Sequence, residues 1–430
     1  MRISKVLTPV LVLALSSALA LPGWSASGTE EKTITITLLH PHPGAYKAVL
    51  AEFAKVHPEI KVEEQSITFN EMINQVQARL GSKDDTLDVL AVDPPRLANM
   101  VSSGFLDEVP KDNAALMKQV DSQVGVQSVT YANVQYAYPI WTSDNLLFYN
   151  TEVLKKAGIA TPGATPSKRW TWEQVLDASK KVKATKAADY GFAIEQVDRY
   201  YALQPMIESF GGSPGLVGDG NLTPDVNSQG WIQFGEWYSS LYTGGLSPRG
   251  IDASQMPELF ANGKVALYLA GPTRIAQLQS SNMVGKWGIS PHPHFQGKKI
   301  ITPTDSWALG VSAFSKKKQA GHTFVKFVAL TKDGATAMSS YFNLPPVNTE
   351  AYPAFIERMR GIAPGKLDQL DAILKEDNGK HARHRPSSIG YVAFEIIMNK
   401  AFSDIRNGFK AKEILDRAQA DLTRTLAQYK

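Results

Sequence analysis

The sequence contains no cysteine in 430 residues, so neither disulfide bonds nor cysteine-ligated metals are available to it. It also lacks a strong excess of one charge, because 45 basic residues face 41 acidic ones and the formal net charge is only +4. This near balance argues against bulk binding of nucleic acid, which requires a broad basic surface. The remaining composition, 43% hydrophobic and 20% charged, is ordinary for a globular protein with a substantial core.

Several catalytic motifs are absent as well. The chain has no H-E-x-x-H zinc signature, no phosphate-binding P-loop and no G-x-G-x-x-G dinucleotide fingerprint. Residues 211–215 read Gly-Gly-Ser-Pro-Gly and match G-x-S-x-G, but a helix is expected before the serine and a loop after it. A nucleophile elbow needs a strand and then a helix, so we interpret this motif as a turn. Asp and Glu are abundant, so spacing alone does not rule out a carboxylate pair for glycoside hydrolysis, although nothing singles one out. A secreted carbohydrate-active enzyme therefore stays an alternative.

Long hydrophobic runs are missing except at the N-terminus. Arg2 and Lys5 precede the apolar run 6–20, which ends in the small-residue pattern Ala18-Leu19-Ala20. We expect a signal peptide within residues 1–26, cleaved after Ala20 or Ala26. The run is shorter than the ~20 residues of a membrane span, and no cysteine follows it to carry a lipid. The sequence therefore predicts an exported, unanchored protein of a bacterial periplasm.

Strand-like and helix-like segments alternate after residue 33. Residues 33–39, 60–67 and 87–92 have the β-branched, bounded pattern of strands, and helical periodicity fills the intervals between them. Such alternation predicts a parallel sheet with helices on its faces. The length suggests two large lobes, because single domains usually have ~100–200 residues.

Short patterns in a fixed order cover most of the chain after the signal segment. They are EFAKVHPEIKV (52–62), LDVLAVD (87–93), YPI (138–140), LFYN (147–150), KKAGI (155–159), WTWE (170–173), LFANGKVAL (259–267) and LPP (344–346). Taken together, the sequence resembles the extracellular solute-binding proteins of ABC transporters. Within them it is similar to family 1, the large carbohydrate-binding group that includes maltose-binding protein.

The resemblance implies an α/β, two-lobed periplasmic-binding-protein fold. Each lobe would be a mostly parallel sheet flanked by helices, with the ligand cleft between the lobes. We expect lobe one to contain residues 33–141 and 289–317, and lobe two to contain 145–288 and 318–430. The crossovers are then expected near 141–145, 288–290 and 315–320.

Two His-Pro-His units hold four of the eight histidines. His40 and His42 end the first expected strand, and ligands of open α/β sheets bind outside such strand ends. We therefore expect them to hydrogen-bond the ligand. Two residues two apart on an extended chain point to opposite sides, and a metal site needs three or four converging ligands, so no metal site is predicted. For His292 and His294 we expect a hinge or surface loop.

The resemblance also implies which other residues face the cleft. With His40 and His42, the candidate ligand contacts are Asp93, Arg96, Trp141, Ser143, Asp144, Arg199, Tyr201, Thr273, Arg274, Asp305, Trp307 and Tyr391. Pro94-Pro95, between Asp93 and Arg96, depart from the family pattern. Thr273 and Arg274 stand where the family often has an aromatic residue, and Asp305 and Trp307 where it often has Gly-Gly.

Several of these candidates also have a structural alternative. Trp307 and Tyr391 would serve equally well in the core. Arg96 and Arg199 would serve equally well in ion pairs that close the lobes. Arg385-Pro386 matches an Arg-Pro pattern of the family, in which a later aromatic residue lines the cleft.

The function implied by the resemblance is that of a receptor with neither enzymatic activity nor cofactor. It would capture a sugar or oligosaccharide, close by hinge motion, and deliver it to the permease subunits of an importer whose ATPase is a separate subunit. We expect a monomer without a nucleic-acid partner. The alternatives are receptors of the same fold for an acidic sugar, a polyol, an organophosphate or a metal ion. An anionic ligand would need two of Arg96, Arg199 and Arg274 to converge.

Overall fold

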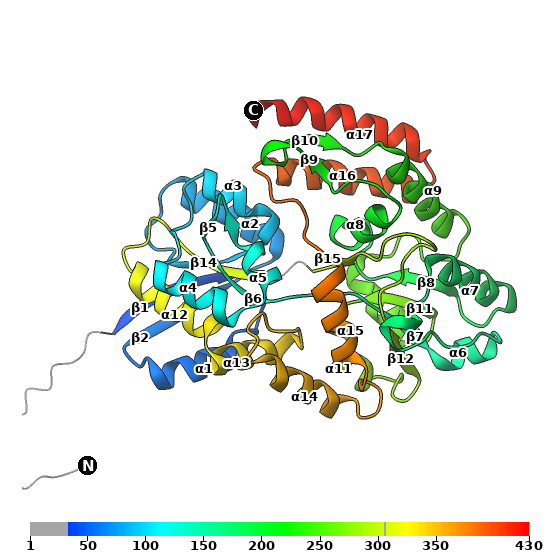
Figure 1. The fold of residues 1–430 in the computed structure, drawn as a ribbon, viewed down its shortest axis with the longest axis horizontal. Coiled ribbons are helices and arrows are strands. Elements are labelled where there is room, and N and C mark those ends of the chain that lie inside the picture. Colours follow the sequence, from blue (N-terminus) through cyan, green and yellow to red (C-terminus); the bar gives the residue numbers. More distant parts are fainter. Residues whose placement is uncertain (1–32, 305–306, 430) are drawn as a thin grey trace, which may run out of the picture. The chain divides into compact units, whose positions relative to one another are not determined.

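The computed structural model describes residues 33–304 and 307–429. The expected signal peptide and the candidate Asp305 lie outside these ranges. The described chain forms two α/β lobes, each built on its own sheet and hydrophobic core (Figure 1). Among the described helices, none combines the length and the hydropathy that crossing a membrane requires.

Lobe one is built on a five-stranded sheet with the strand order β2-β1-β3-β14-β6. Its strands are β1 (Ile34–His40), β2 (Ile60–Ser66), β3 (Val89–Val92), β6 (Tyr138–Trp141) and β14 (Trp307–Val311). Its helices are α1 (Lys47–Val56), α2 (Phe69–Gly81), α3 (Leu97–Ser102), α4 (Lys111–Val120), α5 (Gln123–Ser128), α12 (Lys318–Leu330) and α13 (Lys332–Phe342). The three strands expected in the first ninety residues are all present and pair in parallel.

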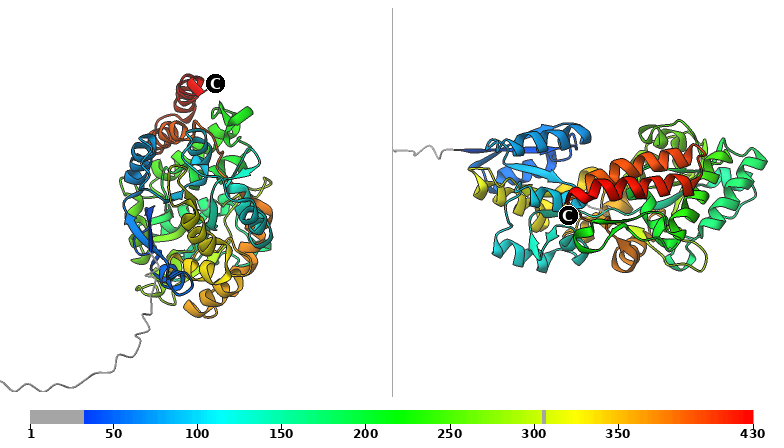
Figure 2. Two further views of the ribbon diagram at one scale, coloured as in Figure 1. Left: turned by 90° about the vertical axis from the view of Figure 1, so that its left-hand side faces the viewer. Right: turned by 90° about the horizontal axis from the view of Figure 1, so that it is seen from above.

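Lobe two is built on a four-stranded sheet with the strand order β12-β7-β11-β8. The strands are β7 (Leu146–Asn150), β8 (Tyr190–Ile194), β11 (Val265–Ala270) and β12 (Trp287–Ser290). The helices are α6 (Thr151–Lys156), α7 (Trp172–Thr185), α8 (Tyr200–Ser209), α9 (Gln229–Thr243), α10 (Met256–Ala261), α11 (Arg274–Gln279), α14 (Tyr352–Ile362), α15 (Leu370–Glu376), α16 (Tyr391–Arg406) and α17 (Ala411–Leu426). Figure 2 shows α16 and α17 side by side.

Alternation along the strands of lobe two separates two cores, because successive side chains of a strand point to opposite faces of the sheet. Leu147 and Phe192 pack on the face covered by α7, α9, α16 and α17. Phe148 and Tyr268 pack on the other face, under α10, α11, α14 and α15. Both faces of the sheet are therefore buried, which explains the nearly continuous apolar run of β11.

Each sheet contains one reversed strand. β14 is antiparallel to both β3 and β6, and β7 is antiparallel to both β11 and β12. These two strands are the ones that the chain enters after leaving the other lobe. A strand entered from the cleft side runs away from the cleft, whereas the other strands run toward it. Most strands of each sheet are therefore parallel to one another. Their carboxyl ends lie at the cleft edge of the sheet, next to the amino end of the reversed strand.

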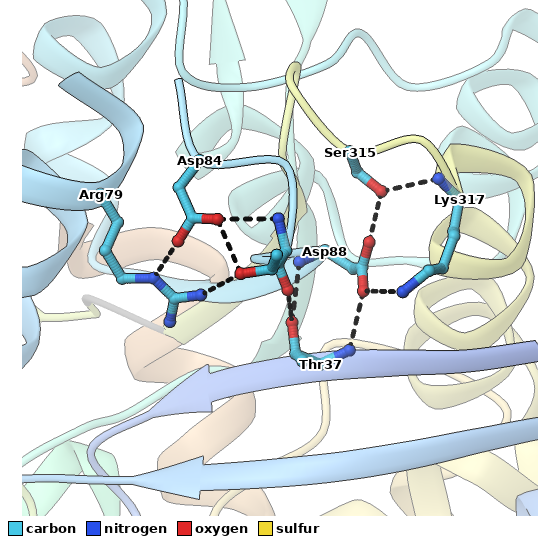
Figure 3. Close-up of polar contacts among 7 residues, drawn as sticks. Thr37, Arg79, Asp84, Asp88, Ser315 and Lys317 are labelled. Atoms are coloured by element: carbon cyan, nitrogen blue, oxygen red, sulfur yellow. Dashed lines mark hydrogen bonds and ion pairs between the residues drawn. The ribbon is translucent and has the colours of Figure 1, made fainter. Parts of the chain in front are cut away.

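The expected placement of α12 and α13 in lobe two is wrong. Phe324, Val325 and Val328 of α12 lie in the core of lobe one. The segment before α12 is fixed to the same lobe, because Ser315 Oγ donates a hydrogen bond of 2.6 Å to the buried Asp88 carboxylate. Lys317 Nζ lies 3.4 Å from the other oxygen of that carboxylate (Figure 3). Amphipathic periodicity predicted the helix correctly but carried no information about which core it would meet.

The second and third crossovers consequently lie later than expected. Phe295 still packs in lobe two, and β13 (Thr302–Pro303) pairs there with β15 (Ala382–Arg383). The chain returns to the sheet of lobe one at β14, rather than directly after residue 290 as expected. The chain leaves lobe one again after Leu344, because Phe355 of α14 lies in a core of lobe two. The first crossover separates β6, which ends at Trp141, from β7, which begins at Leu146.

Replacing Phe324 with alanine should test the placement of α12. The ring is fully buried in the core of lobe one, so its removal should lower the free energy of unfolding by ~3–5 kcal/mol. Hydrogen exchange should accelerate in β1, β3 and β6. The exposed Lys326→Ala on the same helix is the control, with an expected change below about 0.5 kcal/mol. Preferential acceleration in β7 and β11 would contradict the assignment of α12 to lobe one.

Candidate functional site

A cavity of about 460 Å³ lies where the strand ends of the two sheets meet. From lobe one it receives the loops after β1 and β3 and the adjoining ends of β6 and β14, where Trp307 pairs with Trp141. From lobe two it receives the loops after β8 and β11 and the start of the segment into β7. We call this the main cavity. Its position follows from the general rule that open α/β sheets bind ligands outside the carboxyl ends of their strands.

The structure brings nine of the fourteen predicted site residues to the wall of the main cavity. They are His42, Asp93, Trp141, Ser143, Arg199, Tyr201, Thr273, Arg274 and Trp307. Four others lie behind that wall. They are His40, Arg96, Asp144 and Tyr391. Asp305 lies outside the described residues, so its role stays a prediction.

Aromatic rings form the lobe-one side of the main cavity. The His42 ring lies 4.6 Å from that of Trp307 and 5.3 Å from that of Phe342, both edge-on. Phe69 meets Trp307 edge-on at 5.7 Å. Phe69 is held there because α2 begins with a capping box, in which Glu71 N donates to Thr68 Oγ1 and Thr68 N donates to Glu71 Oε2.

The two histidines of the first His-Pro-His unit lie in different places. His42 is on the wall of the main cavity, and His40 is buried behind it. His40 Nδ1 accepts a hydrogen bond of 3.1 Å from the backbone N–H of His42. Its Nε2–H is then free to donate to Glu64 Oε1, at 3.1 Å. Burial lowers the pKa of His40 to about 4 and that of His42 to about 3, so both rings are neutral at neutral pH.

The second His-Pro-His unit belongs to lobe two, with His292 in its interior and His294 half-buried. His292 is fully buried, packs edge-on against Trp172 and donates from Nδ1 to the carbonyl oxygen of Pro293 at 2.8 Å. No group of three or more histidine, aspartate or glutamate side chains suitable for a metal ion occurs within the described ranges. We expected a hinge or surface loop at His292, but the structure places its side chain in the core of lobe two.

Four charged side chains form a closed ring across the two lobes. Asp93 Oδ2 lies 3.1 Å from Arg96 Nε, and Asp93 Oδ1 lies 2.7 Å from Arg385 Nη2. Glu395 completes the ring by pairing with Arg96 through Oε2 and lying 3.7 Å from Arg385 Nη1 through Oε1. Asp93 and Arg96 belong to lobe one, whereas Arg385 and Glu395 belong to lobe two. We call this group the ion-pair ring.

Local sequence explains how the ion-pair ring forms on the lobe-one side. Pro94–Arg96 make a single 3-10 turn, η1, directly after β3. Prolines suit a first turn, where their missing N–H has no intrahelical partner. The turn brings the Arg96 side chain back over Asp93, so the departure of Pro94-Pro95 from the family pattern places these two residues in contact.

Aromatic side chains cover the guanidinium groups of the ion-pair ring. Tyr391 lies under both of them, 5.8 Å from Arg96 and 5.7 Å from Arg385. Tyr391 Oη also accepts a hydrogen bond from Arg385 at 3.2 Å. The four side chains of the ion-pair ring are only 6–12% exposed. Their charges are therefore stabilised by one another and by the aromatic ring of Tyr391. Tyr391 supports the wall of the cavity from behind.

A second ion pair lines the lobe-two side. Arg274 Nε lies 2.7 Å from Glu195 Oε1, and the backbone N–H of Gly271 donates to Glu195 Oε2 at 3.2 Å. Burial raises the pKa of the Glu195 carboxyl, and the nearby Arg274 opposes that shift. Arg199 lies on the same side and has no ion pair within the described residues. Arg96 and Arg274, two of the three arginines considered for an anionic ligand, are thus each neutralised by a carboxylate.

The first crossover contains a buried acidic group that the cavity does not reach. Asp144 is fully buried and its Oδ1 accepts from the backbone N–H of Asn145 at 2.7 Å. Burial, and then the Asp377 carboxylate, raise the pKa of Asp144, whereas Arg169 lowers it. Arg169 is also paired with Asp377. These contacts tie the start of β7 to distant segments of lobe two.

The sequence-based prediction missed several residues on the wall of the main cavity. The most important are Glu195, Glu395, Asn145, Phe69 and Phe342. Glu195 directly follows β8, so the strand-end rule applied to that strand would have found it. Arg385 belongs to the Arg-Pro pattern but was not among the candidates. Glu395 lies inside a helix and carries no local signal.

Two α/β lobes with a cavity between their strand ends are typical of two-lobed solute receptors. The motif Gly211–Gly215 does not add a catalytic serine, because Ser213 Oγ donates to the carbonyl oxygen of Asp225 at 2.8 Å. A helix, α8, precedes it and a short strand, β9 (Gly215–Val217), follows it. This order is the reverse of a nucleophile elbow.

Comparison with known proteins gives the same class. A model of the bacterial extracellular solute-binding protein family matches residues 40–335. The galactooligosaccharide-binding protein of Bacillus subtilis is 25% identical over 316 residues, which are 71% of this chain and 70% of that protein. The sn-glycerol-3-phosphate-binding periplasmic protein of Agrobacterium fabrum is 24% identical over 205 residues, 46% of this chain and 45% of that protein.

Similarity to solved structures extends over the whole fold. An ABC substrate-binding protein from Listeria monocytogenes in complex with cycloalternan superposes with a TM-score of 0.78 at 20% identity. The match covers 92% of this chain and 99% of that one. The protein belongs to the bacterial extracellular solute-binding proteins, since the family model spans well over half of the chain. The predicted resemblance, the two-lobed fold and the expectation of a binding protein rather than an enzyme are confirmed.

Replacing Glu395 with glutamine should weaken the link between the lobes. The change leaves two buried guanidinium groups with a single carboxylate, which should cost on the order of 3 kcal/mol in the free energy of unfolding. X-ray scattering should show a larger radius of gyration. Lys400→Met breaks an exposed pair with Asp404 in the same helix and should cost less than about 1 kcal/mol. Equal effects of the two substitutions would contradict a special role for the ion-pair ring.

Acidification should destabilise the protein through His40 and His42. Their folded-state pKa values, about 4 and about 3, lie below the unfolded value of about 6.5. As the pH falls through this interval, the unfolded state binds more protons than the folded state, so the free energy of unfolding decreases. His42→Phe keeps a ring against Trp307 and should reduce this pH dependence. Thermal unfolding at several pH values measures the slope, and an unchanged slope in the variant would contradict the account.

Proposed function

We propose that the protein is the sugar receptor of an ABC importer and binds a neutral oligosaccharide in the main cavity. The main observation behind the proposal is that the cavity wall combines aromatic rings with charged groups that neutralise one another. From lobe one, Trp307 presents ring surface, and the almost fully buried Trp141 lines the wall beside it. Asp93, Arg385 and Glu195 present polar atoms from both lobes. Sugars offer apolar C–H faces and hydroxyls, and these two kinds of surface complement them.

The ion pairs favour hydroxyl ligands over charged ones. A carboxylate oxygen already paired with arginine keeps a further lone pair, and a guanidinium keeps further N–H donors. Hydroxyl groups can use both without adding net charge to a site of low exposure. Hydrogen bonds to charged partners are also the stronger ones. The proposal is consistent with the oligosaccharide named for the relative from B. subtilis.

An acidic sugar or a sugar phosphate is the second candidate, and one residue favours it. Arg199 lines the main cavity and is exposed, without an ion pair among the described residues. A relative named for sn-glycerol-3-phosphate matches almost half of this chain. Arg96 and Arg274 are already neutralised, however, so a bound anion would have Arg199 as its main cation. We therefore rank this candidate below a neutral oligosaccharide.

The remaining parts of the proposal concern transport. Because the family consists of extracellular receptors, we propose that the protein works in the periplasm as a monomer. Ligand bound at both lobes would stabilise the closed form, since a ligand shifts an equilibrium by its differential affinity for the two states. The closed form would then be recognised by the permease subunits, whose ATPase is a separate chain.

A thermal-unfolding screen of the chain without its signal segment tests the ligand class. The panel contains neutral oligosaccharides, uronic acids, sugar phosphates, polyols, and zinc with and without chelator. A ligand that binds only the folded state raises its stability by ~2.7 kcal/mol at a hundred times its Kd. We expect a shift with neutral oligosaccharides and no product formation. A shift with uronic acids or sugar phosphates alone would favour the second candidate, and one with zinc alone would contradict both.

Replacing Trp307 with alanine should weaken binding of the identified sugar by about tenfold or more, which is ~1.4 kcal/mol. The reason is the loss of an aromatic platform from the wall of the main cavity. Titration calorimetry measures the change. Phe409→Ala, which removes an aromatic ring that is 61% exposed and lies outside the cavity wall, is the control. Equal affinities of wild type and the Trp307 variant would contradict the role of this wall.

A further inference from the structure

A second cavity of about 590 Å³ adjoins the main cavity. Its walls come from both lobes: the first turns of α2, the loop between β8 and α8, and the exposed side of α16. We call it the second cavity. It is not needed to explain the binding of a small sugar, and the proposal above gives no role to Ile73, Asn74, Ile396 or Asn399 on its wall.

The two cavities share three wall residues, so they are neighbouring parts of one depression. Phe69, Arg199 and Glu395 border both of them. Arg96 lies on the wall of the second cavity, whereas Asp93 and Arg385, also members of the ion-pair ring, lie on the wall of the main one. The ion-pair ring therefore stands between the cavities, and any chain that extends from one to the other passes along it.

The second cavity repeats the chemistry of the main one. Ile73, Val392 and Ile396 offer apolar surface, and Ile396 is 66% exposed despite its size. Asn74 and Asn399 offer amide groups, which both donate and accept. Asn399 Oδ1 is buried and has no hydrogen-bond partner within the described ranges. A buried acceptor without a partner is costly, so this amide has an unmet hydrogen-bond requirement at the edge of the second cavity.

The charges of the second cavity are neutralised within the protein, apart from Arg199. Asp198 accepts from Arg406 Nε at 2.9 Å and from Tyr238 Oη at 2.8 Å. Arg96 and Glu395 are partners in the ion-pair ring. The second cavity therefore presents amides and apolar surface, with its charged groups other than Arg199 already paired. That combination is suited to a neutral hydroxylated chain.

We propose that the second cavity is a continuation of the sugar site, which makes the ligand an oligosaccharide too long for the main cavity alone. One end of the chain lies among the aromatic rings of the main cavity. The other end passes Phe69 and Arg199 and reaches Asn74 and Asn399. This inference rests on the proposed function, because it extends the same ligand.

Titration calorimetry with a size-graded series of the identified oligosaccharide, from the monosaccharide upward, tests the inference. Wild-type affinity should increase with length until both cavities are filled. Asn74→Trp places a large ring in the second cavity from an exposed position on α2. This variant should bind the longest member about tenfold more weakly and the shortest member as wild type does. Gln75→Trp, at the adjacent exposed position outside both walls, is the matched control.

A second obstruction, Ile396→Trp, approaches from lobe two and should reproduce the length-dependent loss. An affinity that does not depend on length would overturn the inference, and so would equal losses for short and long sugars. Absence of binding to every sugar, by the wild type itself, would instead contradict the proposed function. A third outcome is that short sugars bind tightly to wild type and to both variants, and that longer sugars bind no better. This result would agree with the proposed function but would show that the second cavity is not part of the sugar site.

Discussion

The two lobes meet through a closed ring of paired charges, and the geometry of the cavity depends on that contact. Asp93 and Arg96 reach it from the turn after β3, and Arg385 and Glu395 reach it from the segment before α16 and from α16 itself. Charges of such low exposure are expensive unless they are paired. Each lobe therefore supplies the counter-charges that the other one needs, and separation of the lobes would expose all four groups together.

The same contact also determines what the cleft offers to a ligand. Because the charges cancel within the wall, a hydroxylated molecule meets strong donors and acceptors without a net charge to balance. The ion-pair ring borders the main cavity on one side and the second cavity on the other. Closure of the lobes, preference for sugars and preference for chain length are thus proposed to depend on one set of residues.

Local sequence patterns predicted the parts of this account that depend on local structure. The β-α-β alternation predicted the parallel half of sheet one, and the strand-end rule predicted His42 at the cavity. Asp93 and Trp141, which also lie there, came from the family resemblance. Glu395 could not be found in this way, because its partner Arg96 is almost three hundred residues away in the sequence. The assignment of α12 to the wrong lobe has the same origin, since the contacts of Ser315 and Lys317 with Asp88 are long-range.

A crystal structure of the protein with a bound oligosaccharide tests the central claim most directly. A sugar ring should lie against Trp307, with hydroxyls in hydrogen-bond contact with Asp93 or Arg385 while the ion-pair ring stays closed. A sugar bound elsewhere on the protein, or a closed, ligand-bound form in which the ion-pair ring is broken, would contradict it.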